Sequence, residues 1–285
     1  MKARWLLKGL LIVATVLAAM LTFLQPSVER QFFYPDRTVY TRPAQYGLQA
    51  EDVWIPAADG QQLHGWWLPA EGPARGTVLH LHGNAANISN HLPLVAWVPR
   101  AGYHLLTFDY RGFGQSPGEP TLDGVVADGL AALAWLRQQH PDQVGRIVVL
   151  GQSLGGATAT RVVAADPAGV KLLVLDCPFS SYRGIASDAV RGTWLAALAP
   201  AAMLALPGAD KDPVTAIRQL KVPLFVLHSE QDTVVPLAHG RALFDAAPEP
   251  KQWLAVSNTP HVDGLTRPPI RQQVIDAMNR AVHGD

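Results

Sequence analysis

Short apolar runs alternate with longer segments of helical spacing along most of the chain. The apolar runs, which we expect to be strands, cover residues 77–81, 103–108, 146–150, 170–175, 220–228 and 252–256. Segments with helical periodicity fill residues 87–100, 122–139, 154–165, 237–246 and 270–282. Strands that are apolar throughout are typical of a sheet buried on both faces. The pattern therefore predicts an α/β domain with a mostly parallel central sheet flanked by helices.

A hairpin signal precedes this alternation. Residues 52–56 and 62–68 have the composition of strands, and they flank the dipeptide Asp59-Gly60. Asp-Gly is favoured in tight turns because both positions tolerate a positive φ. We expect an antiparallel pair at the start of the sheet.

Residues 180–212 interrupt the alternation. Within them, residues 189–205 are small and apolar apart from Arg191, and Pro200 divides the run. An insertion at this point predicts a small helical cap over the carboxyl edge of the sheet. Such a cap either packs on the domain without contacting a ligand or forms an apolar wall of the substrate site.

The first residues of the chain differ from the rest. Residues 9–24 carry no charge, and no acidic residue precedes Glu29. The basic residues of this segment are Lys2, Arg4 and Lys8. An apolar stretch approaching the roughly 20 residues of a spanning helix, with basic residues on its N-terminal side, predicts a membrane anchor. The chain beyond it would then lie on the extracytoplasmic side, which is the periplasm if the protein is bacterial.

A cleaved signal peptide is the alternative for this segment. Ala18 and Ala19 are small enough to precede a cleavage site, and cleavage would release a secreted protein. A buried helix of a soluble domain is the third interpretation. In the first two cases we divide the chain into an anchor or signal segment, residues 1–28, and a catalytic domain, residues 29–285.

Composition narrows the classes of function. Of 285 residues, 48% are hydrophobic and 16% are charged, and the formal net charge is +0. This balance is typical of a globular domain and gives no basic surface for nucleic acid. The single cysteine, Cys177, excludes an intramolecular disulfide and a zinc site built on cysteines. Motifs for phosphate, dinucleotide or metalloprotease sites are absent from the sequence, so we expect neither a metal nor another cofactor.

The strongest chemical signal is the motif Gly151-Gln152-Ser153-Leu154-Gly155. It lies between a predicted strand and a predicted helix, which is the context of a nucleophile elbow. A sharp turn brings the backbone on either side of the serine close to its neighbours, and glycine fits there because it lacks Cβ. The positive end of the following helix favours a developing oxyanion. We predict that Ser153 is a catalytic nucleophile.

A serine hydroxyl needs a base to take its proton, and histidine is the usual one. Of the ten histidines, His261 lies in a polar loop, residues 258–264, between the last predicted strand and the final helix. This agrees with the chain order of serine, acid and histidine in such enzymes. His228 is a rival, but it ends a strand directly before the predicted acid, which favours a structural role.

The acid should follow a late strand, where it fixes the tautomer of the imidazole. Asp232, shortly after the strand predicted at 220–228, has this position. Asp176, at the end of the preceding strand, and Glu230 are the alternatives. We predict that Asp232 orients His261.

An oxyanion hole requires two backbone N–H groups aimed at the developing negative charge. We expect one from Leu154, the residue after the nucleophile. The second should come from the loop after the strand at 77–81, where Asn84 is the predicted donor and Ala85 the adjacent alternative.

Taken together, these motifs resemble a known family. The ordered set comprises His82 to Asn87, Asp109 to Ser116, Gly151 to Gly156, Pro178 to Ser181 and Gln231 to Pro236. Over about residues 30–285 it is similar to the BEM46-like, or serine aminopeptidase S33-like, branch of the α/β hydrolases. The resemblance implies the α/β-hydrolase fold, a triad of Ser153, Asp232 and His261, and acyl transfer to water. Relatives often have an N-terminal membrane segment.

The histidine loop departs from the family pattern. Val262 stands where relatives often have a polar residue, and residues 257–260 lack the usual glycine. The family includes esterases, thioesterases and proteins named as peptidases, so the substrate does not transfer with the resemblance.

We therefore expect a serine hydrolase that cleaves carboxylic ester or thioester bonds of a small-molecule or lipid-like acyl substrate. The alternatives are a peptidase-like activity, an acyltransferase, and a catalytically silent binding protein of the same fold. The expected partners are the substrate and, through the N-terminal segment, a membrane. The sequence leaves the oligomeric state and the acyl chain length open.

Overall fold

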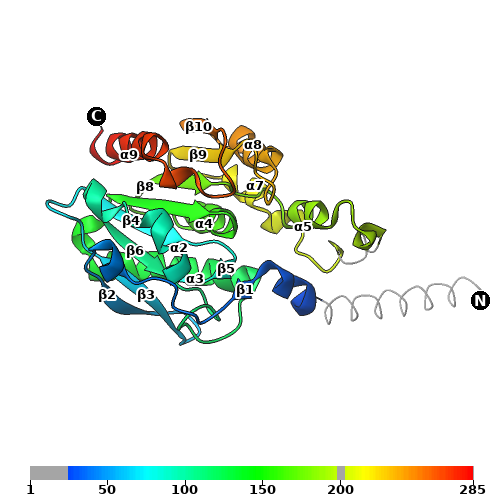
Figure 1. The fold of residues 1–285 in the computed structure, drawn as a ribbon, viewed down its shortest axis with the longest axis horizontal. Helices are drawn as coiled ribbons and strands as arrows, with labels where there is room; N and C mark the ends of the chain where they lie inside the picture. Colours follow the sequence, from blue (N-terminus) through cyan, green and yellow to red (C-terminus); the bar gives the residue numbers. More distant parts are fainter. Residues whose placement is uncertain (1–24, 198–202, 285) are drawn as a thin grey trace, which may run out of the picture.

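The protein forms three layers, with a twisted sheet between two layers of helices (Figure 1). The computed structural model describes residues 25–197 and 203–284. The strands of the main sheet are β2 (Glu51–Pro56), β3 (Gln62–Leu68), β4 (Gly76–Leu81), β6 (Tyr103–Phe108), β7 (Ile147–Gln152), β8 (Val170–Asp176), β9 (Leu224–Ser229) and β10 (Lys251–Val256). They pair in the order β10-β9-β8-β7-β4-β6-β3-β2. Neighbours from β10 to β6 are parallel, whereas β6–β3 and β3–β2 are antiparallel. The predicted sheet, including its hairpin, is confirmed.

Helices cover both faces of the sheet. One face packs against α2 (Ile88–Val95) and α9 (Pro268–His283), and the other against α3 (Leu122–Gln139), α4 (Leu154–Ala165) and α8 (Leu237–Ala246). The alternation of side chains in β7 supplies both cores. Val148 belongs to the cluster with α2 and α9, whereas Val149 belongs to the cluster with α3, α4 and α8. Both faces of the strand are therefore apolar, as its sequence requires.

Most predicted boundaries agree with the structure, and the exceptions have local causes. The predicted helix at 87–100 ends as α2 at Val95, and a 3₁₀ turn follows at Pro99–Ala101. Proline has no N–H to donate to a continuing helix, which explains the early end. Similarly, β9 begins at Leu224 rather than at residue 220, directly after Pro223, which cannot donate to a strand ladder.

The cap segment follows β8. It contains α5 (Tyr182–Val190) and a 3₁₀ turn, η5 (Trp194–Ala197), before the chain returns to the domain through α7 (Pro213–Ile217). In Figure 1 this segment projects beyond the carboxyl ends of the strands. The domain boundaries predicted from the sequence stay a prediction.

The N-terminal chain reaches the same end of the molecule. Strand β1 (Tyr34–Pro35) pairs with β5 (Ala85–Ala86), which directly follows the loop after β4. Of the predicted anchor, residues 1–24 lie outside the described residues. In the part of the chain that the structure describes, no helix has the length and apolar character needed to cross a membrane.

Candidate active site

Ser153 occupies a strained turn between β7 and α4. Its backbone has φ 55° and ψ −117°, a combination that non-glycine residues rarely adopt. The motif glycines are required by close packing around this turn. A Cβ on Gly155 would lie 2.0 Å from the carbonyl oxygen of Leu81, and a Cβ on Gly151 would lie 2.4 Å from that of Gly155. The turn therefore has the features of a nucleophile elbow, with the serine at the N-terminus of a helix.

Asp232 and His261 meet beyond the ends of β9 and β10. Asp232 Oδ2 lies 2.6 Å from Nδ1 of His261. The carboxylate is fully buried, whereas 15% of the imidazole is exposed. The N–H groups of Val234 and Val235 also donate to Asp232 Oδ1, at 2.9 and 2.8 Å. This arrangement fixes the ring and leaves Nε2 for proton transfer.

The ionised form of Asp232 is stabilised by its partners. Burial acts to raise the pKa of this carboxyl group, but the hydrogen bond with His261, the charge of the imidazolium and the two backbone N–H groups outweigh it. The pKa of Asp232 is therefore held below its ordinary value. The group remains a carboxylate that can orient and stabilise a protonated histidine.

The serine and the acid–base pair are connected through the end of β8. The N–H of Ser153 donates to the carbonyl of Asp176 at 2.9 Å. The next residue, Cys177, has its Sγ in a group with the ligand atoms of Asp232 and His261, all within 4.8 Å of one another. Between the described residues no hydrogen bond joins Ser153 Oγ to His261. Catalytic hydrogen bonds are often long in a ligand-free enzyme.

The same three side chains, Cys177, Asp232 and His261, form a set of donors that a metal ion can use. In this structure two of them are bonded to each other, and burial raises the pKa of the Cys177 thiol far above its ordinary value. A thiol rather than a thiolate is the form present at neutral pH, and thiolate is the form that binds metal. The donor set therefore fits a hydrogen-bonded pair next to a buried thiol better than a metal centre.

The rival acids have other partners. Asp176 is buried, and its Oδ2 accepts a hydrogen bond from Gln152 Nε2 at 2.9 Å. Burial raises the pKa of Asp176 to about 6. Glu230 accepts a hydrogen bond from the hydroxyl of Ser257. Of the three candidates, Asp232 is the one that the structure places in hydrogen-bonding distance of His261.

The rival base, His228, lies inside β9. Its side chain is fully buried, and Nε2 donates to the carbonyl of Val235 at 2.9 Å. Burial lowers its pKa, so the neutral ring is favoured. These contacts are typical of a structural histidine.

The two predicted oxyanion donors lie on adjoining segments. Leu154 begins α4, and Asn84 lies in the loop after β4, which packs against α4 where Gly155 meets the carbonyls of Leu81 and His82. Among the described residues, neither the Leu154 nor the Asn84 N–H donates a hydrogen bond within the protein. The N-terminal chain holds the other side of this loop, because the carbonyl of Asn84 accepts the N–H of Tyr34 at 2.8 Å.

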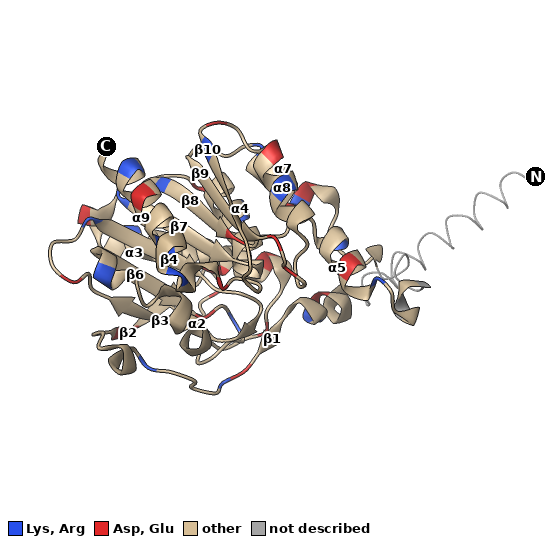
Figure 2. Cartoon of the chain, turned by 45° about the horizontal axis from the view of Figure 1, so that its top comes forward, with Lys and Arg blue, Asp and Glu red and all other residues tan. Residues whose placement is uncertain are grey.

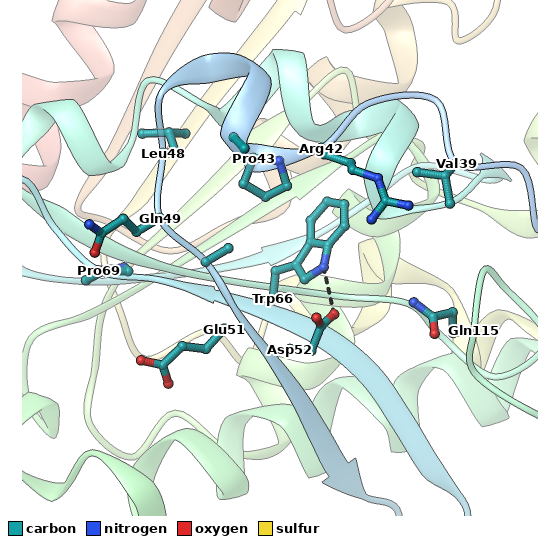
Figure 3. Close-up of a pocket in the computed structure, with 12 residues that line it drawn as sticks. Val39, Arg42, Pro43, Leu48, Gln49, Glu51, Asp52, Trp66, Pro69 and Gln115 are labelled. Carbon is teal, nitrogen blue, oxygen red and sulfur yellow. Dashed lines mark hydrogen bonds between the residues drawn. The ribbon is translucent and has the colours of Figure 1, made fainter.

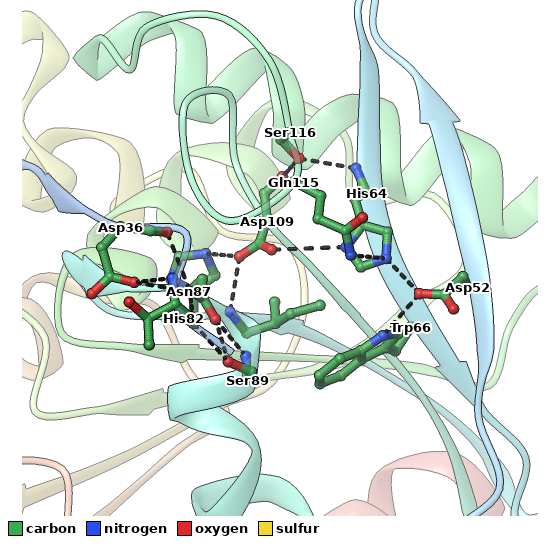
Figure 4. A network of polar contacts seen from close by, with 12 residues as sticks. Asp36, Asp52, His64, Trp66, His82, Asn87, Ser89, Asp109, Gln115 and Ser116 are labelled. Atoms are coloured by element: carbon green, nitrogen blue, oxygen red, sulfur yellow. Dashed lines mark hydrogen bonds and ion pairs between the residues drawn. The ribbon is translucent and has the colours of Figure 1, made fainter. Parts of the chain in front are cut away.

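A network of buried polar side chains lies behind this loop (Figure 4). Asp109 Oδ1 accepts the N–H of Ile88 at 2.8 Å and lies 3.7 Å from Nε2 of His82, while Oδ2 lies 3.9 Å from Nδ1 of His64. On its other side, His64 Nε2 lies 2.6 Å from Asp52. The network connects the first residue of the oxyanion loop to strand β3.

The protonated form of His64 is favoured by its carboxylate neighbours. Burial acts to lower the pKa of this histidine, but hydrogen bonds and charges from Asp109 and Asp52 outweigh it, so the pKa is raised. Burial lowers the pKa of His82 well below its ordinary value and raises that of Asp109. The sequence showed Asp109 only as part of a family motif. Its role as the central acceptor depends on contacts between distant segments.

An apolar cavity of about 630 Å³ begins at Asn84. Its apolar lining comes from the N-terminal chain, α5, the segment after residue 202 and the loop of the predicted acid: Val28, Phe32, Ile185, Ala189, Val190, Met203, Leu206 and Val234. The volume is within the usual range of about 300–1,000 Å³ for small-molecule sites. The cavity therefore adjoins a predicted oxyanion donor, Asn84.

A second cavity, of about 600 Å³, lies between the chain at residues 39–52 and strand β3 (Figure 3). The indole N–H of Trp66 donates to Asp52 at 3.1 Å on its wall. Arg42 and Glu51 add charge. None of the predicted triad or oxyanion residues lines this cavity.

The structure contains a second hydrogen-bonded set of serine, histidine and aspartate. The hydroxyl of Ser180 lies 2.8 Å from Nδ1 of His239, and Nε2 of His239 lies 3.0 Å from Asp188. The backbone N–H of Ser180 also points to the same Nδ1, at 3.2 Å. The set connects α5 of the cap to α8. The sequence had suggested no role for His239, because its partners are 51 and 59 residues away.

Comparison with known proteins agrees with this architecture. Residues 72–215 match the family model described as serine aminopeptidase, S33. The YfhR protein of Salmonella typhi is 34% identical over 283 residues, which cover 92% of this chain and 90% of that protein. The lysophosphatidylserine lipase ABHD12 of Macaca fascicularis is 30% identical over 215 residues, which cover 68% of this chain and 51% of that protein.

Solved structures show the same fold. The Pyrococcus furiosus esterase Pf2001 superposes with a TM-score of 0.69 at 24% identity, covering 88% of this chain and 98% of that chain. The family match includes Ser153 but ends before Asp232 and His261. The assignment of the acid and the base therefore depends on the geometry described above.

Proposed function

Because the chain belongs to the serine aminopeptidase S33 family and is a hydrolase of the α/β-hydrolase fold, we propose that it cleaves carboxylic ester or thioester bonds through Ser153, His261 and Asp232. The observation that supports this most directly is the 2.6 Å contact between a fully buried Asp232 and a partly exposed His261. The pair lies at the carboxyl ends of the strands, where Ser153 also lies, directly before α4.

The proposed reaction follows from this geometry. His261 Nε2 removes the proton of Ser153 as the hydroxyl oxygen attacks the carbonyl carbon of the substrate. The N–H groups of Leu154 and Asn84 stabilise the oxyanion of the tetrahedral intermediate. His261 then protonates the departing alcohol or thiol. Water, activated by the same imidazole, hydrolyses the acyl-enzyme and restores Ser153.

The cavity next to Asn84 supports an acyl substrate, either a small molecule or a lipid-like one. Its lining is mostly apolar and contains no carboxylate. Similarity to an enzyme named as a lipase and to structures named as esterases points in the same direction. An aminopeptidase needs a negative group for the substrate amine, and this cavity offers none among its described residues.

We also propose that the N-terminal segment holds the catalytic domain on the extracytoplasmic side of a membrane. Residues 9–24 are uncharged, and basic residues precede them. A mass measurement of the mature protein isolated from membranes distinguishes a retained anchor from a cleaved signal.

Replacement of the nucleophile tests the function. The full chain should hydrolyse a short-chain aryl ester and react with a fluorophosphonate probe, and Ser153→Ala should lose both. We expect turnover to fall on the order of 10⁴-fold or more. Ser180→Ala is the matched control, since it removes the serine of the other set, and it should keep labelling and most of the turnover.

Full labelling of Ser153→Ala would contradict the assignment of the nucleophile. Faster cleavage of an amino-acid anilide than of the ester would favour a peptidase. Transfer of the acyl group to an added alcohol in preference to water would favour an acyltransferase. A folded wild-type protein with no turnover and no labelling would indicate a binding protein.

A further inference from the structure

Exposed apolar side chains lie on and next to the segments that line the cavity beside Asn84. Among the described residues, eight large hydrophobic side chains are exposed; two of them line this cavity, and two more lie within four residues of a lining position. We call these four the apolar rim: Tyr34, Trp194, Leu204 and Val234. Trp194 is 78% exposed and Leu204 is 61% exposed. Single exposed apolar residues need no explanation, but a group at the opening of one cavity marks an interaction surface.

The rim consists of chain segments that are far apart in sequence. Tyr34 and Val234 line the cavity itself, Trp194 lies in η5 beyond α5, and Leu204 follows Met203, another lining residue. Removing large apolar side chains from water is favourable, so their exposure in the free protein favours association with an apolar partner.

The segment that contains Trp194 and Leu204 has no charged residue. From residue 192 to residue 209 the sequence contains no Asp, Glu, Lys or Arg. Figure 2 shows the described part of this segment uncoloured by charge, while α5 beside it carries both signs, including the ion pair of Arg191 with Asp188. An apolar and aromatic surface of this kind fits the boundary between the acyl chains and headgroups of a lipid layer.

The path of the N-terminal chain favours a lipid layer as the partner of the apolar rim. The uncharged residues 9–24 lead directly to Gln25, and Ser27 and Val28 line the mouth of the cavity. The chain then reaches Tyr34, which is hydrogen-bonded to the oxyanion loop. A chain that enters a lipid layer immediately before Gln25 would hold the cavity mouth at its surface.

We propose that the apolar rim docks on a lipid layer, so that the cavity takes up the single long acyl chain of an ester directly from that layer. This inference rests on the proposed function and extends it to the source of the substrate. The acyl chain would lie between the N-terminal chain and α5, with its carbonyl end toward Asn84, the predicted oxyanion donor that lines the cavity.

Fluorescence in vesicles tests the docking without any reaction. The full chain is reconstituted into phosphatidylcholine vesicles as Leu204→Cys, labelled with an environment-sensitive dye. Val144→Cys is the matched control, because Val144 is also exposed and lies before β7, at the other end of the strands. Wild-type protein should take up no dye, since Cys177 is buried. We expect a blue-shifted emission and quenching by nitroxide lipids at position 204 only.

Rates of ester hydrolysis by variants of the apolar rim are the second test of the docking. The double variant Trp194→Ser, Leu204→Ser should hydrolyse a long-chain ester embedded in the vesicles at least about tenfold more slowly. Its hydrolysis of a water-soluble short-chain ester should remain within about twofold of wild type, since neither residue lines the cavity. Val144→Ser should change neither rate.

The outcomes separate the two proposals. Equal quenching at positions 204 and 144, or unchanged hydrolysis of the embedded ester by the double variant, would overturn the docking. A dye at position 204 that neither nitroxide lipids nor aqueous iodide can quench would show that protein covers the rim, which also overturns the docking. If the wild type does not hydrolyse the water-soluble ester, the proposed function is wrong. The fluorescence measurement in vesicles still tests the docking, because it needs no reaction.

Discussion

Two sets of serine, histidine and aspartate lie in this molecule, and their hydrogen bonds alone would favour the set that is not the proposed catalytic one. His261 lies 2.6 Å from Asp232, and His239 lies 3.0 Å from Asp188 and 2.8 Å from the hydroxyl of Ser180. By bond count, the second set is the more complete. The backbone around each serine differs.

Ser153 has a positive φ and precedes a helix whose first N–H donates to no other described residue, whereas Ser180 has no positive φ. In that set, Nδ1 of His239 already accepts a backbone N–H as well as the hydroxyl. Its lone pair is therefore shared with a donor that never gives up its proton. The comparison shows that a catalytic set is recognised by an accessible base and an oxyanion site, more than by the three side chains.

The largest difference between the two sets should appear when each loses its acid–base contact. Asp232→Asn removes the charge that fixes the tautomer of His261, and we expect turnover of a short-chain ester to fall about 10²–10⁴-fold. Asp188→Asn, the matched change in the other set, should keep turnover within about threefold. Equal losses from the two variants would remove the distinction drawn above.

A smaller effect is expected from His239 itself. His239→Ala breaks the contacts between α5 and α8, so we expect a loss of unfolding free energy of about 1–3 kcal/mol. Because α5 lines the cavity, KM for a long-chain ester should rise a few-fold while kcat for a short-chain ester changes little. His239→Gln can keep one hydrogen bond, so its unfolding free energy and its KM should lie between those of the wild type and His239→Ala. A collapse of kcat would assign His239 to the chemistry instead.

The smallest effect concerns a third histidine–carboxylate pair. In this pair the histidine is buried and the carboxylate is exposed, the reverse of His261 and Asp232. His64 is 2% exposed and Asp52 is 67% exposed. Since the pKa of His64 is raised in the folded protein, its contacts stabilise the fold fully below about pH 6.5 and cease to do so as the pH rises through the raised pKa.

Asp52→Asn should therefore destabilise the protein at pH 5.5, by less than about 1 kcal/mol because Asp52 is exposed to solvent. Urea unfolding at pH 5.5 and 8.5 measures this, and the difference from wild type should shrink at the higher pH. Glu51→Gln, a change at the neighbouring exposed residue, is the control. A difference that grows with pH would contradict the assigned direction of the shift.

Local sequence was sufficient where the structure depends on neighbouring residues. The strand, the motif glycines and the helix around Ser153 are contiguous, so the elbow could be predicted from one segment. The helix predicted at residues 122–139 also has a local start signal, because the side chain of Thr121, directly before it, accepts the N–H of Gly124 at 3.0 Å. The chain order of serine, acid and base then selected Asp232 and His261, and the structure places these two side chains in contact.

The contacts that sequence could not show all join distant segments. Asp109 meets His82 and His64, and His239 meets Ser180 and Asp188, only because the sheet and the cap bring them together. Periodicity describes each element separately and contains no information on such pairs. The sequence suggested the cap as a possible apolar wall, but it could not show the cavity next to Asn84, since its lining comes from five separate stretches of chain.

The order of the strands has a consequence for the newly made protein. From β7 to β10, each strand pairs with the one synthesised before it, and β10 forms the outer edge of the sheet. The serine elbow therefore assembles first, and His261 arrives only five residues after β10 ends at Val256. A nascent or truncated chain without its last strand would contain the proposed nucleophile but lack the proposed base. On the proposed mechanism, hydrolysis would begin only when the final edge of the sheet is in place.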